Sequence, residues 1–67
     1  MFISKIGKII KESPFKREYI QKEIGVSRNT LSSWCMGKTH PNAPELFRLA
    51  RLLERDVHDF YEWEENK

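Results

Sequence analysis

Several features that define other classes of protein are rare or missing in this sequence of 67 residues. Its single cysteine, Cys35, can form no intramolecular disulfide, and no cysteine–histidine spacing matches a zinc site. No stretch approaches the roughly 20 apolar residues of a membrane span, and Lys5 and Lys8 interrupt the N-terminal run, unlike a signal peptide. There is no repeat and no linker. These absences predict a single domain over residues 1–67 that folds in a reducing cytoplasm, without a membrane.

The sequence also lacks a recognisable catalytic set. Serine, histidine and aspartate are all present, but no spacing places them around a polar pocket, and a chain this short barely encloses one. The two histidines, His40 and His58, show no metal-binding pattern. We therefore expect no enzymatic activity, no metal and no cofactor.

Charge is abundant but unevenly distributed along the chain. The net charge is +2, yet residues 1–40 hold eight basic and three acidic side chains, whereas residues 41–67 hold four basic and seven acidic ones. An asymmetry of this kind between two halves of a chain suggests an anionic partner for the basic half.

Apolar residues recur at helical spacing in the first part of the chain. Ile3, Ile6 and Ile10 predict a helix of about nine residues, which the Ser13–Pro14 step ends because the residue before proline avoids the α region. A second helix, opening at either Pro14 or Lys16, runs to about Ile24. Ser13 is a candidate cap for it, and its apolar stripe comprises Phe15, Tyr19, Ile20 and Ile24.

A glycine and a serine then mark the start of a third helix. Gly25 can take the left-handed conformation that closes a helix, and Ser27 is a good N-cap for a helix over residues 28–36. Leu31 and Trp34 mark its inner face, and Gly37 its end.

The remaining sequence predicts two more helices. Asn42 and Glu45 form a capping box ahead of a leucine-rich stripe, and Asp56 caps a fifth helix whose inward residues are Val57, Phe60 and Tyr61. The polar residues 62–67 are expected to fray. The predicted fold is all-α, with five helices and no strand.

The stretch most informative about function is residues 16–37, which reads helix, glycine turn, serine cap, short helix, glycine stop. So short a turn leaves the second helix protruding. No acidic residue occurs from Ser27 to Met36, and the outer face carries arginine, asparagine and two serines. Arginine can bond guanine O6 and N7, and asparagine can bond adenine N6 and N7.

At this point the sequence resembles the Cro/repressor-type helix-turn-helix family, over about residues 3–61. The resemblance implies a compact five-helix, lambda-repressor-like fold. It rests on Ile20, Gly25-Val26-Ser27, Thr30-Leu31-Ser32, Trp34, Gly37-Lys38, Pro41, Leu46, Leu49, Ala50, Leu53, Asp56-Val57 and Phe60.

The resemblance also implies roles for individual residues. Four fall where the family reads bases: Arg28, Asn29, Ser32 and Ser33. Four more fall where it caps the helix or touches the DNA backbone: Arg17, Ser27, Thr30 and Lys38. The sequence departs from the family where Gln21 replaces a small residue at the helix crossing, where Arg17 replaces a glutamine, and where Cys35 and Ile10 replace an ion pair.

Two functions are consistent with these features. The favoured one is a regulator of transcription, a repressor similar to those of phages or mobile elements, that binds double-stranded DNA as a weak homodimer. The other is a protein-interaction module of the same fold, an antitoxin or an adaptor of another regulator. The predicted dimer surface comprises Arg55, Val57, Tyr61 and Trp63.

Overall fold

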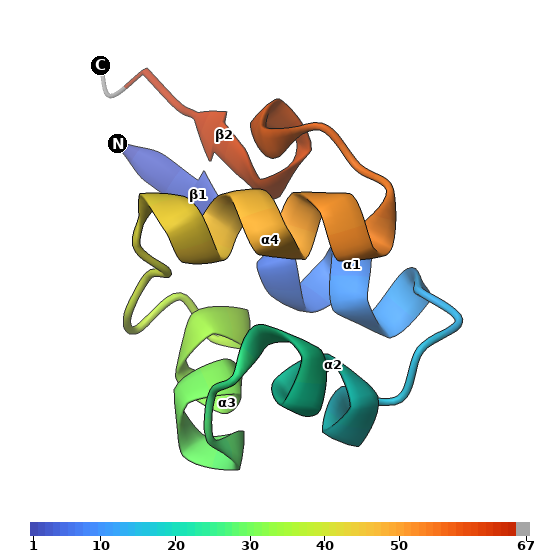
Figure 1. Ribbon diagram of the computed structural model, residues 1–67. Coiled ribbons are helices and arrows are strands. Elements are labelled where there is room, and N and C mark those ends of the chain that lie inside the picture. The colour runs from blue at the N-terminus through green and yellow to red at the C-terminus, as the bar shows by residue number, and fades with distance from the viewer. Residues whose placement is uncertain (66–67) are drawn as a thin grey trace.

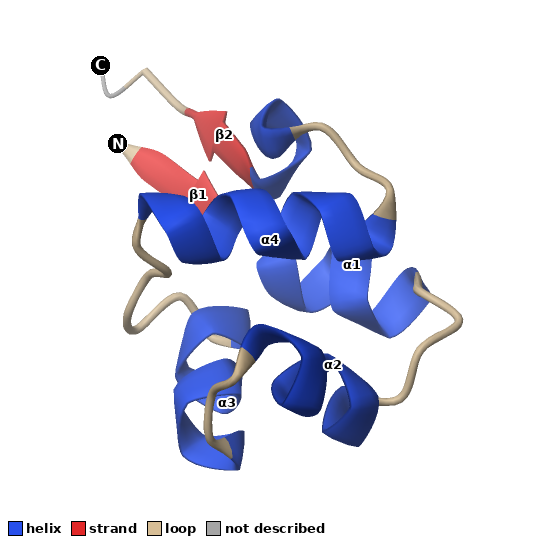
Figure 2. Cartoon of the chain, in the orientation of Figure 1, coloured by secondary structure: helices blue, strands red, loops and turns tan. Residues whose placement is uncertain are grey.

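Four α-helices, one 3-10 turn and two short strands make up the described part of the protein (Figure 1, Figure 2). The computed structural model describes residues 1–65. Within that range no helix is long and apolar enough to cross a bilayer. The elements are, in chain order, β1 (Phe2–Ser4), α1 (Ile6–Glu12), α2 (Arg17–Ile24), α3 (Arg28–Cys35), α4 (Ala43–Leu53), the 3-10 turn η1 (Val57–Phe60) and β2 (Tyr61–Trp63).

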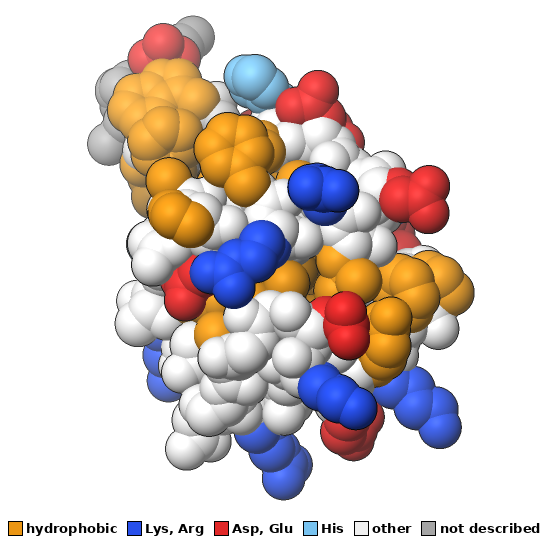
Figure 3. All heavy atoms as spheres, in the orientation of Figure 1, with side chains coloured by type: hydrophobic (Ala, Val, Ile, Leu, Met, Phe, Trp, Pro, Cys, Tyr) orange, Lys and Arg blue, Asp and Glu red, His pale blue; other side chains and the backbone are white. Residues whose placement is uncertain are grey.

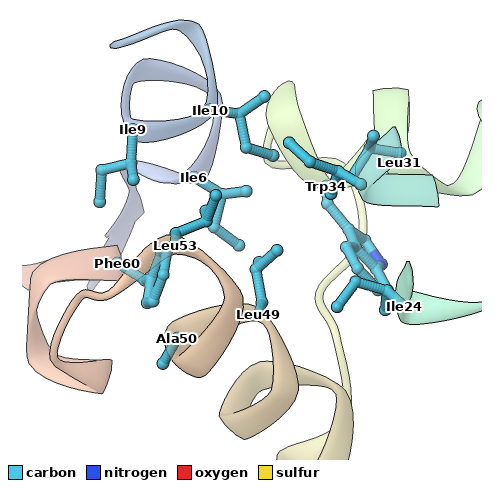
Figure 4. Packing of buried hydrophobic residues seen from close by; sticks show 11 residues of the cluster. Ile6, Ile9, Ile10, Ile24, Leu31, Trp34, Leu49, Ala50, Leu53 and Phe60 are labelled. Atoms are coloured by element: carbon cyan, nitrogen blue, oxygen red, sulfur yellow. The ribbon is translucent and has the colours of Figure 1, made fainter. Parts of the chain in front are cut away.

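One apolar cluster holds these elements together (Figure 4). Every α-helix and η1 contribute to it, and Ile6, Ile20, Leu49 and Phe60 are fully buried. The apolar stripe predicted for α4 is buried at Leu49, Ala50 and Leu53, and α4 packs against α2 and η1. The complete cluster is Ile6, Ile9, Ile10, Ile20, Ile24, Leu31, Trp34, Leu49, Ala50, Leu53 and Phe60.

The N-terminal segment differs from the prediction. The expected helix from Ile3 begins only at Ile6, because Phe2–Ser4 forms strand β1. This strand pairs antiparallel with β2, Phe2 opposite Trp63 and Ser4 opposite Tyr61. The partners lie about sixty residues apart in the chain, so helical periodicity alone misassigned Ile3.

The predicted fifth helix was also wrong. Asp56 does cap the segment, accepting from the His58 amide at 3.1 Å, but only the four residues of η1 follow. That bond holds the pKa of the Asp56 carboxyl below its ordinary value. Tyr61–Trp63 then continues as strand β2, in which two aromatic residues alternate with a glutamate, a pattern typical of strands. The prediction that residues 62–64 fray is wrong, because the Glu64 amide donates to the Met1 carbonyl at 2.8 Å. Residues 66–67 lie outside the described range.

The other helix boundaries separate the alternatives that the sequence left open. Helix α2 starts at Arg17, with Lys16 as its N-cap, rather than at Pro14. Ser13 ends α1 instead of capping α2, and its hydroxyl donates to the Ile10 carbonyl at 2.9 Å. The predicted capping box of Asn42 and Glu45 is confirmed, with bonds of 2.8 and 2.9 Å.

Helices α1 and α3 approach each other at a glycine. A Cβ atom on Gly7 would lie 2.6 Å from the carbonyl oxygen of Cys35, closer than atoms can pack. Glycine at position 7 therefore lets the backbone of α1 touch the C-terminal end of α3, which fixes α3 against the core.

Candidate nucleic-acid interface

The turn between α2 and α3 is built by three consecutive residues. Gly25 takes a left-handed conformation with φ of 84°, and its amide donates to the Gln21 carbonyl at 2.8 Å. Val26 packs against the core, half-buried, and its amide donates to the same carbonyl at 3.1 Å. These contacts end α2 abruptly and direct the chain into α3.

Ser27 caps α3 as predicted. Its hydroxyl oxygen accepts from the Thr30 amide at 3.1 Å and bonds the Thr30 hydroxyl at 3.0 Å. One of the free amides at the start of the helix is thereby satisfied. The two hydroxyls support each other at the exposed end of α3.

Two buried residues fix the rotation of α3 about its own axis. Leu31 and Trp34 are 1% and 2% exposed and point into the core (Figure 4). Because side chains on one face of a helix recur every three or four residues, the opposite face is turned outward. It carries Arg28 and Asn29, both exposed, at its start, and the half-buried Ser32 and Ser33 in its second turn.

A polar hollow of about 370 Å³ separates α2 from α3. The Arg17 guanidinium reaches across it, and its Nη1 donates to the Ser32 hydroxyl at 3.5 Å. The structure thus brings together Arg17, which the resemblance assigned to the DNA backbone, and Arg28 and Ser32, which it assigned to bases. The hollow is lined by Arg17, Glu18, Gln21, Arg28 and Ser32.

Glu18 and Gln21 were not predicted as site residues. Gln21 was noted only as an unusually large residue at the helix crossing, and the structure places it in the lining of the hollow. The Arg17–Ser32 contact joins residues fifteen apart on two helices, so no local pattern in the sequence reveals it.

Lys38 lies at the other end of α3. Gly37, with φ of 74°, ends the helix, and the Lys38 amide donates to the Ser33 carbonyl at 3.0 Å. Its exposed side chain is separated from Arg28 by the length of the helix, about 12 Å at 1.5 Å per residue. Asn29, Ser33 and Lys38 do not line the hollow.

The electrostatics of this face favour an anion. The first turn of α3 holds no acidic residue, so no side chain of α3 itself offsets the partial positive charge of the helix N-terminus. In Figure 3 the surface over α3, at the lower left, is mainly uncharged and polar, with basic side chains along its lower edge. On the core side of α3, burial raises the pKa of the Cys35 thiol, although Arg17 opposes the shift. A thiol in this state is a packing group rather than a nucleophile.

Comparison with known proteins agrees with this geometry. The helix-turn-helix family model matches residues 7–60, which is most of the chain. The protein belongs to the helix-turn-helix family of the Cro/repressor type. This is a family of DNA-binding proteins, and the match includes the whole of α2, the turn and α3.

One solved structure is similar over nearly the full length of this helix-turn-helix protein. It is the crystal structure of a protein from Bacteroides fragilis that is named, provisionally, as a DNA-binding protein. The two share 27% identity with a TM-score of 0.84, and the alignment covers 92% of this chain and 100% of the other. No curated protein matches the sequence.

The residues predicted for a dimer surface lie around η1 and β2. Arg55 is exposed and lies 3.8 Å from the Glu12 carboxylate, while Val57 is half-buried against the core. Tyr61 is also half-buried, with its hydroxyl 3.0 Å from Nδ1 of His40, whereas Trp63 is 57% exposed. Burial raises the pKa of the Tyr61 phenol. Among the described residues, no three His, Cys, Asp or Glu side chains gather as metal ligands would.

Proposed function

We propose that this protein binds double-stranded DNA sequence-specifically by placing α3 in the major groove. The observation that carries the proposal is the exposed pair Arg28 and Asn29. Both stand at the protruding N-terminal end of a helix that has no acidic residue, and in the described structure neither side chain has a hydrogen-bond partner. Donor groups left free in this way are suited to base edges, where a bidentate contact discriminates by about 1–3 kcal/mol.

Backbone contacts position this helix in the proposed complex. Arg17 and Lys38 stand near opposite ends of α3, so they can grip phosphates on either side of the groove. Ser27 and Thr30 present hydroxyls beside the helix start. Ser32 and Ser33 are small enough to let the second turn of α3 approach the bases, and Ser32 is placed to hold the Arg17 guanidinium.

The regulatory role follows from occupancy of a site. A protein bound in the major groove of an operator excludes other proteins, so we infer that it represses transcription, in the manner of regulators from phages and mobile elements. Two copies would read two half-sites whose centres are about 34–36 Å apart, one helical turn of DNA.

Selection from random duplexes tests this proposal. The protein is incubated with a randomised double-stranded pool at near-physiological salt, and the retained fraction is sequenced over several rounds. We expect one short motif to be enriched, repeated with two-fold symmetry at higher protein concentration. Retention without any enriched motif, falling steeply with salt, would show charge-driven binding alone and would contradict the proposal.

A protein-interaction module is the second candidate function. It is favoured by the exposed aromatic rings of Phe2 and Trp63, which are 67% and 57% exposed at the end of the molecule away from Arg28. Under this alternative, a different protein co-purifies in stoichiometric amount and no DNA motif is enriched.

A further inference from the structure

The two-stranded sheet has an unused edge on β1. Hydrogen-bonded pairs join Met1 to Glu64 and Lys5 to Phe60, at 2.8 Å each. Because such pairs alternate along an antiparallel ladder, Ile3 also bonds Glu62, while the backbone groups of Phe2 and Ser4 point away from β2. Within residues 1–65 these outward amides and carbonyls have no hydrogen-bond partner.

Aromatic residues cover the face of the sheet beside this edge. The Phe2 ring meets the Trp63 ring edge-on at 5.0 Å and the Tyr61 ring at 6.1 Å. A hollow of about 230 Å³ lies next to them, lined by Phe2, Tyr61, His40 and Pro41. In Figure 3 hydrophobic side chains gather at the upper left, where Figure 1 places the strands.

This edge carries none of the usual protection against pairing. Exposed edge strands are normally blocked by a charge, a proline or a bulge, yet β1 consists of phenylalanine, isoleucine and serine. An isolated two-stranded sheet is also marginally stable in water and gains from further strands. The edge is therefore open to another strand of low charge.

We propose that β1 pairs antiparallel with β1 of a second copy, centred on Ile3, to form a four-stranded sheet across the two chains. In this register Phe2 lies opposite Ser4 of the second copy, and Ser4 lies opposite Phe2 of the second copy. The outward groups of both residues are then satisfied by four new hydrogen bonds. The two Ile3 residues face each other as a non-hydrogen-bonded pair, with Cα atoms about 4.5 Å apart.

Charge selects β1 over β2 as the paired edge. The same symmetric arrangement on β2 would centre on Glu62 and set two glutamates directly opposite, which is destabilising. Glu64 and Glu65 follow and add to the repulsion. On β1 the charges lie only at the flanks, and each has a partner within its own chain: the Met1 ammonium donates to the Glu64 carbonyl at 2.8 Å, and Lys5 is held by Glu62 at 3.1 Å.

The proposed pairing leaves the DNA-reading end of α3 free. Ser4 approaches α3 only at its C-terminal end, where its hydroxyl lies 3.5 Å from the Trp34 carbonyl oxygen. Arg28 is at the opposite end. A contact of three residues per copy is small, so two copies associate weakly in solution. Their association is strengthened when adjacent half-sites on DNA hold them together. In that one respect the inference rests on the proposed DNA binding.

Disulfide trapping tests the register without DNA, so its result is independent of whether the protein binds DNA. Ile3→Cys and Glu62→Cys are each made in a Cys35→Ser background and oxidised mildly at millimolar protein. The two sites are cross-strand neighbours on the same face of the sheet, which makes them matched. We expect Ile3→Cys to give a covalent dimer, because about 4.5 Å between Cα atoms suits a disulfide. Glu62→Cys stays monomeric, because Glu64 and Glu65 still disfavour pairing on β2 after the central glutamates are removed. Equal cross-linking of both, or none at position 3, overturns the proposal.

A proline pair provides the second measurement. Phe2→Pro removes an outward amide from β1, and Trp63→Pro removes one from β2; neither amide takes part in the ladder between the strands, and each variant loses one exposed aromatic ring. By sedimentation we expect Phe2→Pro to weaken self-association at least tenfold and Trp63→Pro to change it less than threefold. Equal effects would show that the aromatic face, or a partner other than a second copy, uses this surface, and would overturn the pairing.

Discussion

The two ends of α3 lie in different surroundings. At its N-terminal end the surface is polar, with Arg28 and Asn29 exposed and the Ser27 cap beside them. At its C-terminal end the backbone touches Gly7 and Ser4, and the neighbouring surface is aromatic, with Phe2 and Trp63 exposed.

Under the two proposals, one short helix separates two kinds of recognition. Base edges require free donors that make specific hydrogen bonds, and only the first end offers them. A contact between copies requires apolar area and unpaired strand edges, and only the second end offers these. The predictions below test whether the two ends behave independently.

The two tryptophans give the largest expected contrast. Trp34→Ala removes a side chain that is 2% exposed and should cost about 3–5 kcal/mol, enough to unfold much of so small a domain. Trp63→Ala alters a ring that is 57% exposed and should cost far less. Thermal or urea denaturation measures both; similar losses would show that the hairpin end belongs to the core.

Gly7→Ala tests the close approach of α1 to α3. The added methyl group would meet the Cys35 carbonyl oxygen at 2.6 Å, so the helices must separate. We expect a loss of about 1–3 kcal/mol in unfolding free energy, as for other overpacked sites. Lys8→Ala, at an exposed position on the same helix, is the control and should change stability by less than about 0.5 kcal/mol. A neutral Gly7→Ala would mean that the contact is looser than the structure has it.

Ser27→Ala removes the cap at the N-terminal end of α3. The Thr30 amide loses its acceptor, and stability should fall by about 0.5–2 kcal/mol. Ser33→Ala, which removes a hydroxyl from the outer face of the same helix, should leave stability within about 0.5 kcal/mol of the parent. Calorimetry on the two variants separates the loss of the helix cap from the loss of an outward-facing hydroxyl, and an unchanged Ser27→Ala would contradict the capping role.

Arg17→Ala and Lys38→Ala should have the smallest and least specific effects. Each should weaken binding to any duplex and make the logarithmic salt slope shallower by about one unit, since one fewer counterion is released. Lys11→Ala, on the exposed face of α1, serves as the control. If the slope stays unchanged in the Arg17 and Lys38 variants, these side chains lie away from the phosphates.

Sequence patterns predicted the N-terminal end of α3 well because its signals are local. Gly25, Ser27 and the Leu31–Trp34 spacing act within one or two turns of each other, and the structure confirms the turn, the cap and the buried face. The capping box of α4 was predictable for the same reason.

The hairpin end was mispredicted because its pairing is not local. Ile3 fits the spacing of α1, and only its partner strand, some sixty residues away, makes it a strand residue. Tyr61 was assigned to a helix by its spacing from Val57, although its alternation with Trp63 carried a strand signal. The Arg17–Ser32 contact needed the angle between α2 and α3, which no sequence pattern specifies.

Asn29→Ala tests the central claim, that α3 reads DNA bases, most directly. It removes no charge, so non-specific binding and the salt slope should stay close to the parent values. Affinity for the selected duplex should fall about tenfold to a hundredfold, the equivalent of one bidentate base contact. An Asn29→Ala variant that folds normally and binds the selected duplex as tightly as the parent would contradict base reading by this helix.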